Sequence, residues 1–248
     1  MKTSNKILLG TIGFMVFCML TFLIYMRANV TTQVYQEDRS EWKTHTHNVS
    51  DFQEIVVQIA ADVHIAQGEA QLEMKGTEDV LSKVDVNVND GKLTVRIKDN
   101  ESISTRSSKL SLFITTDSLV NVLHTGAGSI ESASILTFPS LNIRTTGAND
   151  ASLQIDCQEF SYYQTGVGSA NIAGKTERAS YTNTGAGNMD ASDFEAKTVE
   201  IHGTGIGSFD VHATEQLNIN LSGAGSVKYK GNPRIQQNVS GIGRVSAM

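Results

Sequence analysis

A four-residue phrase rich in glycine repeats seven times in the second half of the sequence. Each copy reads Thr or Ser, then Gly, then Ala, Val or Ile, then Gly or, once, Asn. Successive copies start 18 to 21 residues apart, and their first glycines are Gly126, Gly147, Gly166, Gly185, Gly205, Gly223 and Gly241. A regular period this short is typical of a solenoid, whose units cannot bury a hydrophobic core alone.

The residues around each phrase follow the pattern of β-strands. Positions five and three before the Thr or Ser are apolar in most copies and enclose a polar residue, as in Leu141-Asn142-Ile143. This alternation predicts a strand with one buried face. The position five after the Thr or Ser is apolar in every copy, from Ile130 to Val245, and it predicts a second short strand.

Two short strands within about 19 residues predict a parallel β-helix. A βαβ unit needs roughly thirty residues or more, and these repeats show no helical pattern. Stacked coils would instead form parallel sheets at a strand spacing of about 4.8 Å. Because parallel crossover connections are almost always right-handed, we expect an all-β, right-handed solenoid with seven coils over residues 120–248.

The repeated glycines have a structural explanation and a functional one. They either allow a positive φ or a close backbone approach at a tight corner, next to a ladder of Thr and Ser hydroxyls, or they form a phosphate site. The structural explanation is favoured because no copy carries a P-loop pattern or a dinucleotide-binding pattern before a helix. Asn149, which replaces one glycine, is also tolerated at positive φ.

Residues 48–119 lack the phrase but alternate in the same way, for example at Leu93-Val95-Ile97. Asn89-Asp90-Gly91 is typical of a hairpin turn. We expect this region to form irregular first coils that cap the open strand edge of the solenoid. At the other end no capping pattern follows the seventh phrase, so the last coil could pair with another copy of the chain.

The beginning of the sequence predicts a membrane anchor. Lys2 and Lys6 precede an uncharged run of twenty residues, 7–26, which is long enough to cross a bilayer as a helix. Basic residues on its N-terminal side place residues 1–6 in the cytoplasm by the positive-inside rule. We therefore expect a single-pass signal anchor in the inner membrane.

The segment after the anchor, 27–47, is polar and predicts a linker. Under this topology the domain at 48–248 lies in the periplasm or outside the cell. Cleavage near Ala28, which would give a secreted or surface protein, is the alternative.

Composition excludes several other classes of protein. The chain has 20 basic and 26 acidic residues, and a net charge of −6 argues against nucleic-acid binding. Two cysteines, Cys18 and Cys157, cannot make a disulfide-rich scaffold or a cysteine-based zinc site. The histidines do not fall in register as three ligands of one coil. We therefore expect no metal and no cofactor.

Three segments carry a resemblance to a known family. They are FQEIVVQIAADVHIAQGEAQLEMKG, VDVNVNDGKLTVRIKD and LSLFITTDSLVNVLHTGAGSI, followed by the repeats. In this order they resemble the putative auto-transporter adhesins with a head GIN domain, which are common in envelope proteins of Bacteroidota. The resemblance implies an exported β-helical domain with an adhesive or surface role, and it transfers no catalytic residue.

The favoured hypothesis for function is binding without catalysis. A regular outer face rich in Asn, Ser, Thr and Gln suits hydrogen bonds to an envelope protein or glycan. Tyr163 is the one tyrosine near the repeats expected to point outward, where it could stack on a sugar. Asp190 and Asp210 are the other candidate ligand-binding residues, and the ligand itself stays unidentified.

Two alternatives stay open. A polysaccharide-cleaving enzyme would need paired carboxylates, and Asp190 and Asp210 occupy the same outward column one coil apart, at about 5 Å by strand spacing. A self-associating envelope scaffold, a homo-oligomer built through the last coil, is the other alternative.

Overall fold

The computed structural model describes residues 42–103 and 110–248, which belong to one compact unit, Glu41–Met248. Strands dominate the described residues, and their single helix is α2 (Glu78–Lys83). The strands before the repeats are β1 (Lys43–His47), β2 (Glu54–Gln58), β3 (Asp62–Ala66), β4 (Gln71–Gly76), β5 (Val84–Asn89), β6 (Lys92–Ile97) and β7 (Leu110–Thr115). The strands of the repeats are β8 (Asn121–Ser132), β9 (Leu136–Val167), β10 (Ala170–Asn183), β11 (Met189–Gly203), β12 (Ile206–Leu221), β13 (Ala224–Lys230), β14 (Arg234–Val239) and β15 (Ile242–Ala247).

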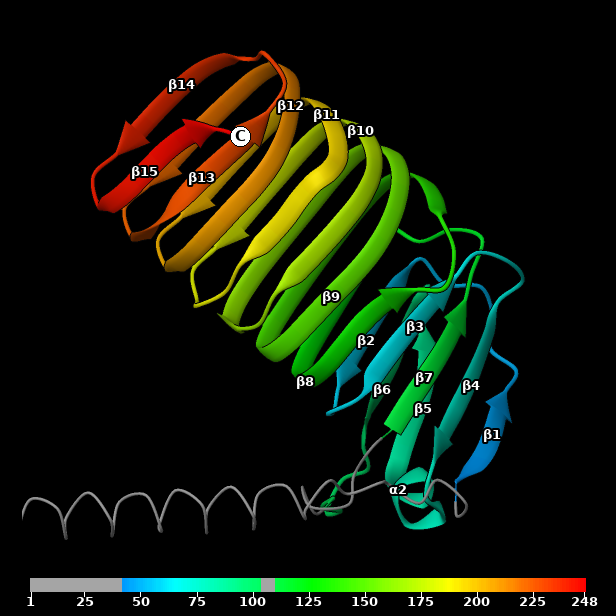
Figure 1. Ribbon diagram of the computed structural model, residues 1–248. Helices are drawn as coiled ribbons and strands as arrows, with labels where there is room; N and C mark the ends of the chain where they lie inside the picture. The colour runs from blue at the N-terminus through cyan, green and yellow to red at the C-terminus, as the bar shows by residue number, and fades with distance from the viewer. Residues whose placement is uncertain (1–41, 104–109) are drawn as a thin grey trace, which may run out of the picture. The chain divides into compact units, whose positions relative to one another are not determined.

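The repeats form a solenoid of parallel strands, as the period predicts. Each strand from β8 to β12 pairs in parallel with the next, and β12 then pairs with both β13 and β14 (Figure 1). Equivalent glycines of the phrase are direct neighbours, for example Gly126 and Gly147. This register confirms a β-solenoid with coils of about 19 residues, while its right-handedness stays a prediction.

Two inward columns build the core of the solenoid. The column five before the phrase contains buried Leu141, Phe160, Ala179, Val199 and Leu217, as the alternation predicts. In the first and last coils its members Val120 and Ile235 are instead 38% and 37% exposed. The coil of Ile235 lies at the end of the stack, where fewer side chains cover it, whereas Val120 comes just before β8 and lines a surface hollow.

A close backbone approach, more than φ, explains the glycines. A Cβ added to Gly205 would lie 1.9 Å from the carbonyl oxygen of Gly185, and one at Gly166 would lie 2.0 Å from that of Gly147. Among the first glycines of the phrases, a φ in the left-handed region occurs at Gly126, Gly147 and Gly166. Successive coils therefore touch through bare backbone at this corner.

Asn149 does not fill its glycine slot through positive φ, and that explanation is wrong. Within the described residues, the non-glycine residues with positive φ are Asp90 and Asn100. The Asn149 side chain is buried instead, and its Nδ2 donates to the carbonyl oxygens of Thr146, at 3.1 Å, and Gly126, at 3.3 Å. One step of the expected hydroxyl ladder forms between Thr165 and Thr184, whose Oγ1 atoms lie 3.1 Å apart.

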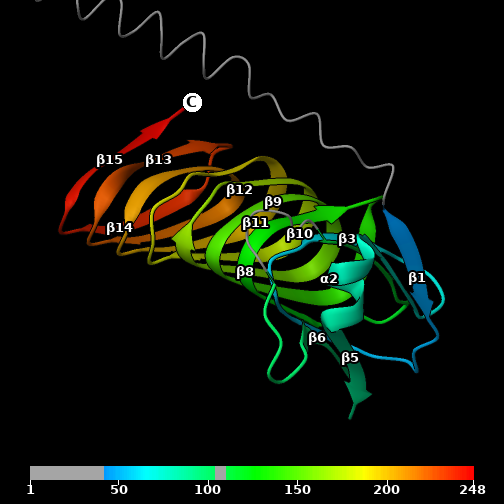
Figure 2. The same ribbon diagram turned by 90° about the horizontal axis from the view of Figure 1, so that it is seen from below.

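The region before the repeats changes from parallel to antiparallel pairing. β2 and β3 both pair in parallel with β8. On their other sides, β2 pairs in parallel with β6, and β3 pairs in parallel with β7. The remaining pairs are antiparallel: β4 with β7, β5 with β6, and β1 with β4. The turn between β5 and β6 consists of Asp90 and Gly91, with φ of 51° and 72°. Figure 2 shows α2, β5 and β6 at the opposite end of this unit from β15.

Two predictions concern residues near the start of the chain. The predicted linker 27–47 ends in a strand, because 43–47 form β1 and pair with β4. The predicted anchor, 7–26, lies outside the described residues. Within the part of the chain that the structure describes, no helix has the length and apolar character needed to span a membrane.

Candidate functional site

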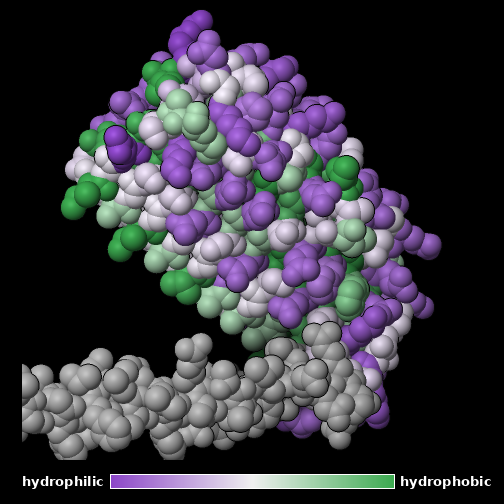
Figure 3. Space-filling view, in the orientation of Figure 1, coloured by the Kyte–Doolittle hydropathy of each residue, from purple (hydrophilic) through white to green (hydrophobic). Residues whose placement is uncertain are grey.

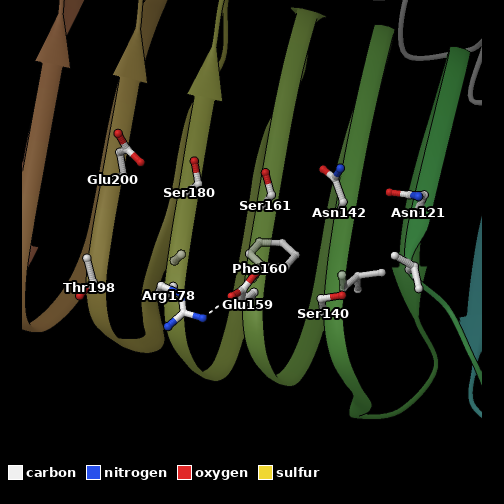
Figure 4. Close-up of a pocket in the computed structure, with 13 residues that line it drawn as sticks. Asn121, Ser140, Asn142, Glu159, Phe160, Ser161, Arg178, Ser180, Thr198 and Glu200 are labelled. Carbon is white, nitrogen blue, oxygen red and sulfur yellow. Dashed lines mark hydrogen bonds and ion pairs between the residues drawn. The ribbon is translucent and has the colours of Figure 1, made fainter.

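A shallow groove crosses the strands that precede the glycine phrases, and we call it the polar groove after its outward row of polar side chains, although Val120, Phe160 and Ala179 also line it. Its largest hollow has a volume of about 440 Å³. The residues four before each phrase point outward into it from neighbouring strands, and in Figure 4 they form a row. The labelled members of this row are Asn121, Asn142, Ser161, Ser180 and Glu200.

Two further hollows extend this groove at its ends. One of about 230 Å³ shares Asn121 and Asn142 and reaches β2 and β6 at Glu54 and Lys92. The other, of about 360 Å³, shares Glu200 and continues to β14. Because neighbouring strands lie about 4.8 Å apart, the groove offers one polar side chain per coil at nearly constant spacing.

Two pairs of oppositely charged side chains lie in the groove. Arg178 donates to Glu159, and this partner raises the pKa of the guanidinium (Figure 4). At one end Lys92 Nζ lies 3.5 Å from Glu54 Oε2. Exposed pairs of this kind add little stability, but they leave the groove close to electrically neutral. Such a surface fits an uncharged ligand better than a polyanion.

Glu200 is also paired, since its Oε1 lies 2.9 Å from Nε2 of His202. The groove thus contains carboxylates, but each contacts a basic side chain. An ionised carboxylate can still accept hydrogen bonds from hydroxyl groups, so Glu159 and Glu200 add acceptors to the amides and hydroxyls of the floor.

Tyr163 lies beside this groove but is not a free stacking platform. The Arg144 guanidinium sits over its ring at 4.3 Å from the centroid, which covers one face. Hydrogen bonds with Thr165 and Thr184, and then the Arg144 charge, lower the pKa of the phenol. Tyr163 is therefore held in place, and Arg144 is the member of this pair that lines the groove.

Asp190 and Asp210 are neighbours in register, as the repeat predicts, but they do not line the described groove. They follow the glycine corner, on the second strand of their coils. Oδ1 of Asp190 accepts from the backbone N–H of Ser192 at 3.0 Å. Oδ1 of Asp210 is buried without a hydrogen-bond partner. The structure thus brings the carboxylates together without placing them in a cleft.

The glycine corners do not enclose a ligand-sized space. A void beside Gly205, Gly207, Gly223 and Gly225 measures about 10 Å³, which is close to the minimum for one water molecule. A phosphate group does not fit there. Across residues 42–103 and 110–248, no three His, Cys, Asp or Glu side chains converge as metal ligands would.

Sequence analysis predicted a polar outer face suited to hydrogen bonding, but it did not predict that one column of this face lines a groove. Aligning the copies shows that the residue four before each phrase is Asn, Ser or Glu from the first coil to the fifth, and Asn218 and Gln236 continue the series. The ion pair of Arg178 with Glu159 was not predicted, because their separation of 19 residues has meaning only once the coils are stacked in register.

Comparisons with known proteins agree with the fold. The family model described as putative auto-transporter adhesin, head GIN domain, matches residues 51–233. A putative adhesin from Bacteroides fragilis has 25% identity and a TM-score of 0.79, over 84% of this chain and 97% of that one. No curated protein matches the sequence significantly.

Two further solved structures share the fold. A protein from Parabacteroides distasonis described as a putative lipid binding protein has 20% identity and a TM-score of 0.66, over 84% of this chain and 97% of that one. A putative adhesin from Parabacteroides merdae has 23% identity and a TM-score of 0.65, over 84% and 96%. At these identities the two structures show the fold alone.

Proposed function

Because the chain belongs to the family of putative auto-transporter adhesins with a head GIN domain, we propose that it binds an extended, uncharged envelope glycan along its polar groove without cleaving it. The observation that carries this proposal is the row of amide, hydroxyl and carboxylate side chains at one per coil. A polymer with hydroxyl groups on every unit matches a surface that repeats its hydrogen-bonding groups at every strand.

The electrical neutrality of the groove supports a glycan without charged groups. Its basic residues Lys92 and Arg178 contact carboxylates of the same surface, and Arg144 contacts the Tyr163 ring. A polyanion would have to displace these partners to gain its own ion pairs. Neutral sugars can instead use the remaining hydrogen-bonding capacity of the side chains as they stand.

Binding without catalysis is supported by the position of the paired carboxylates. Glycoside hydrolysis needs two carboxyl groups that flank the scissile bond. Asp190 and Asp210 follow the corner and lie outside the groove in which we place the glycan. A glycan bound by the protein is therefore expected to be recovered with its original chain length, as judged by chromatography.

We further propose that the chain is anchored in the inner membrane with its solenoid outside the cytoplasm. The uncharged run of twenty residues after Lys2 and Lys6, 7–26, supports this topology. Mass spectrometry of the mature protein tests it, because an anchored chain retains residues 7–26. A mature chain that begins near Ala28 would contradict the anchor and favour a secreted or surface protein.

The groove proposal is tested by filling the groove with a bulky side chain. Ser161→Trp and Ser180→Trp place an indole in the middle of the row, and we expect each to weaken retention of neutral envelope polysaccharide at least tenfold. Ser152→Trp is the matched control, because Ser152 is exposed on a strand segment beyond the corner. Equal retention by all three variants and the parent chain would contradict the proposal, as would retention of a protein alone.

A further inference from the structure

The third residue of every glycine phrase points outward and is apolar. Val167, Ile206 and Ile242 are 53%, 65% and 87% exposed. We call the full column the apolar ridge, and its members are Ala127, Ala148, Val167, Ala186, Ile206, Ala224 and Ile242. Figure 3 shows separate hydrophobic patches in a row along the left edge of the solenoid. In Figure 1 the same edge contains the turn from β14 to β15.

The fold does not require apolar side chains on this ridge. The residues point away from the core, and the neighbouring glycines, replaced once by the buried Asn149, lack side chains that could cover them. An outward position that is apolar in all seven coils, including a side chain as exposed as Ile242, is typical of a surface that contacts another molecule. The polar groove uses none of these residues.

The surroundings of the ridge are almost uncharged. On one side lie the Thr and Ser residues that open each phrase. On the other side, two positions after the ridge, five of the seven residues are neutral, one is acidic and one is basic. This flanking column is Ser129, Asp150, Ser169, Asn188, Ser208, Ser226 and Arg244. Its two charges are therefore one acid in the second coil and one base in the seventh.

The size of the ridge residues alternates along the stack. Bulky side chains occupy the third, fifth and seventh coils, at Val167, Ile206 and Ile242, and alanines occupy the coils between them. In register, Ala186 is the direct neighbour of both Val167 and Ile206. Because strands lie about 4.8 Å apart, bulky side chains recur about every 10 Å, with a gap above each alanine.

We propose that the apolar ridge binds the same ridge of a second copy of this chain in an antiparallel, two-fold symmetric dimer. A two-fold axis parallel to the strands, between the fourth and fifth coils, places each bulky residue opposite an alanine. Val167 then faces the partner's Ala224, Ile206 faces the partner's Ala186, and Ile242 faces the partner's Ala148. Such an isologous contact closes on itself and does not build a fibre.

The two charges select this register. Shifting the partner by a single coil puts Ile206 against the partner's Ile206, so bulky residues collide. Shifting it by two coils restores the size match but separates the charges. Only the axis between the fourth and fifth coils brings Asp150 opposite the partner's Arg244, and the symmetry makes this pair twice. Complementary charges of this kind fix register more than they add affinity.

The contact is small. Seven coils at the strand spacing give a strip about 30 Å long. With three outward side chains across its width, the two copies together bury about 1,000 Å² or less, which is the low end of specific interfaces. We therefore expect a weak dimer that forms with rising concentration, or with the confinement that a shared membrane provides.

Analytical ultracentrifugation of the full chain in detergent over a range of concentrations tests this proposal. The parent chain is expected to show a monomer–dimer equilibrium, and Ile206→Lys is expected to weaken it at least tenfold. Ala186→Ile, which fills the gap opposite the partner's Ile206, is expected to weaken it as well. Gln158→Lys is the matched control, because Gln158 is exposed and belongs to neither the ridge nor the groove, and it should leave association nearly unchanged.

A charge exchange separates this dimer from any other association. Asp150→Arg and Arg244→Asp are each expected to weaken dimerisation several-fold, because each puts like charges opposite one another. The double variant is expected to recover the parent constant within about threefold. Asp150 also accepts from the backbone N–H of Ser169 at 2.7 Å, so thermal unfolding of each variant checks that the fold is intact.

Three outcomes would overturn the proposal. One is a chain that stays monomeric at all concentrations. Another is dimerisation that persists unchanged in Ile206→Lys. The third is a double charge variant as weak as the single ones. A monomeric chain that loses binding to a lipid surface or to a different protein in Ile206→Lys would assign the ridge to that occupant instead.

Discussion

The groove and the glycine corner belong to the same coils but obey different constraints. At the corner, the backbone of one coil touches the backbone of the next, and a single added carbon at Gly205 would meet a carbonyl oxygen at 1.9 Å. In the groove, outward side chains such as Ser161 and Ser180 are half-buried and line an open hollow. The most repeated residues are therefore the ones that hold the fold, while the groove positions are free to vary with a ligand.

The largest effect is expected at the corner. Gly205→Ala should lower the free energy of unfolding by roughly 3–5 kcal/mol, because its Cβ can fit only if the two coils separate. Gly91 is the matched control, since it has a φ of +72° but nothing within 4 Å of an added Cβ. Gly91→Ala should cost only about 1 kcal/mol, the conformational penalty alone. Equal losses in chemical denaturation would show that the two coils can separate at little cost, so that backbone contact does not require glycine at this corner.

The pH dependence of stability should come in part from the inward side of the corner. His124 precedes the first phrase and is fully buried, and burial lowers the pKa of its imidazole despite the nearby carbonyl oxygen of Ile59. Below the unfolded pKa of about 6.5, the unfolded chain then binds a proton more readily than the folded chain. Stability is therefore present above about pH 6.5 and is lost as the pH falls.

His124→Gln should reduce this acid sensitivity, by at most about 1.4 kcal/mol per pH unit for one proton. The comparison uses denaturation between pH 5 and pH 7, at about one-unit steps around the unfolded pKa. His202→Gln is the control, because His202 is partly exposed beside Glu200. An unchanged slope in His124→Gln would mean that other groups carry the acid sensitivity.

A smaller effect is expected in the core beneath the groove. The hydroxyl of Tyr181 is buried without a hydrogen-bond partner, and burial raises the pKa of this phenol strongly. Tyr181→Phe removes an unsatisfied polar group and keeps the ring, so the free energy of unfolding should rise by up to about 1 kcal/mol. A loss of stability measured by thermal or chemical unfolding would show that the hydroxyl has a partner in solution.

The smallest effect on stability is expected in the groove itself. Arg178→Ala breaks an exposed ion pair with Glu159 and should change the free energy of unfolding by at most about 0.5 kcal/mol. It leaves Glu159 unpaired in the groove, so glycan retention should change even though the fold does not. A large loss of stability would show that the groove residues, like the corner glycines, are needed for the fold.

Particular residues show how far sequence analysis reached. The phrase period predicts that Asp190 and Asp210 are neighbours, and the pairing of β11 with β12 agrees. The predicted role of Asn149 was wrong. We expected a positive φ at this position, but the buried Asn149 side chain instead donates hydrogen bonds to backbone carbonyl oxygens. The strand at 43–47 was missed, because its partner β4 is antiparallel and carries no repeat.

The sequence by itself determined the period, the strands and the register of the coils, because equivalent residues of a repeat stack on one another. Only the tertiary structure decided which way each side chain points after the corner. The apolar positions two and five after the Thr or Ser lie on opposite faces of a strand, and periodicity cannot say which is inside. Backbone contact at the glycines sets the bend, which buries Phe209 and exposes Ile206.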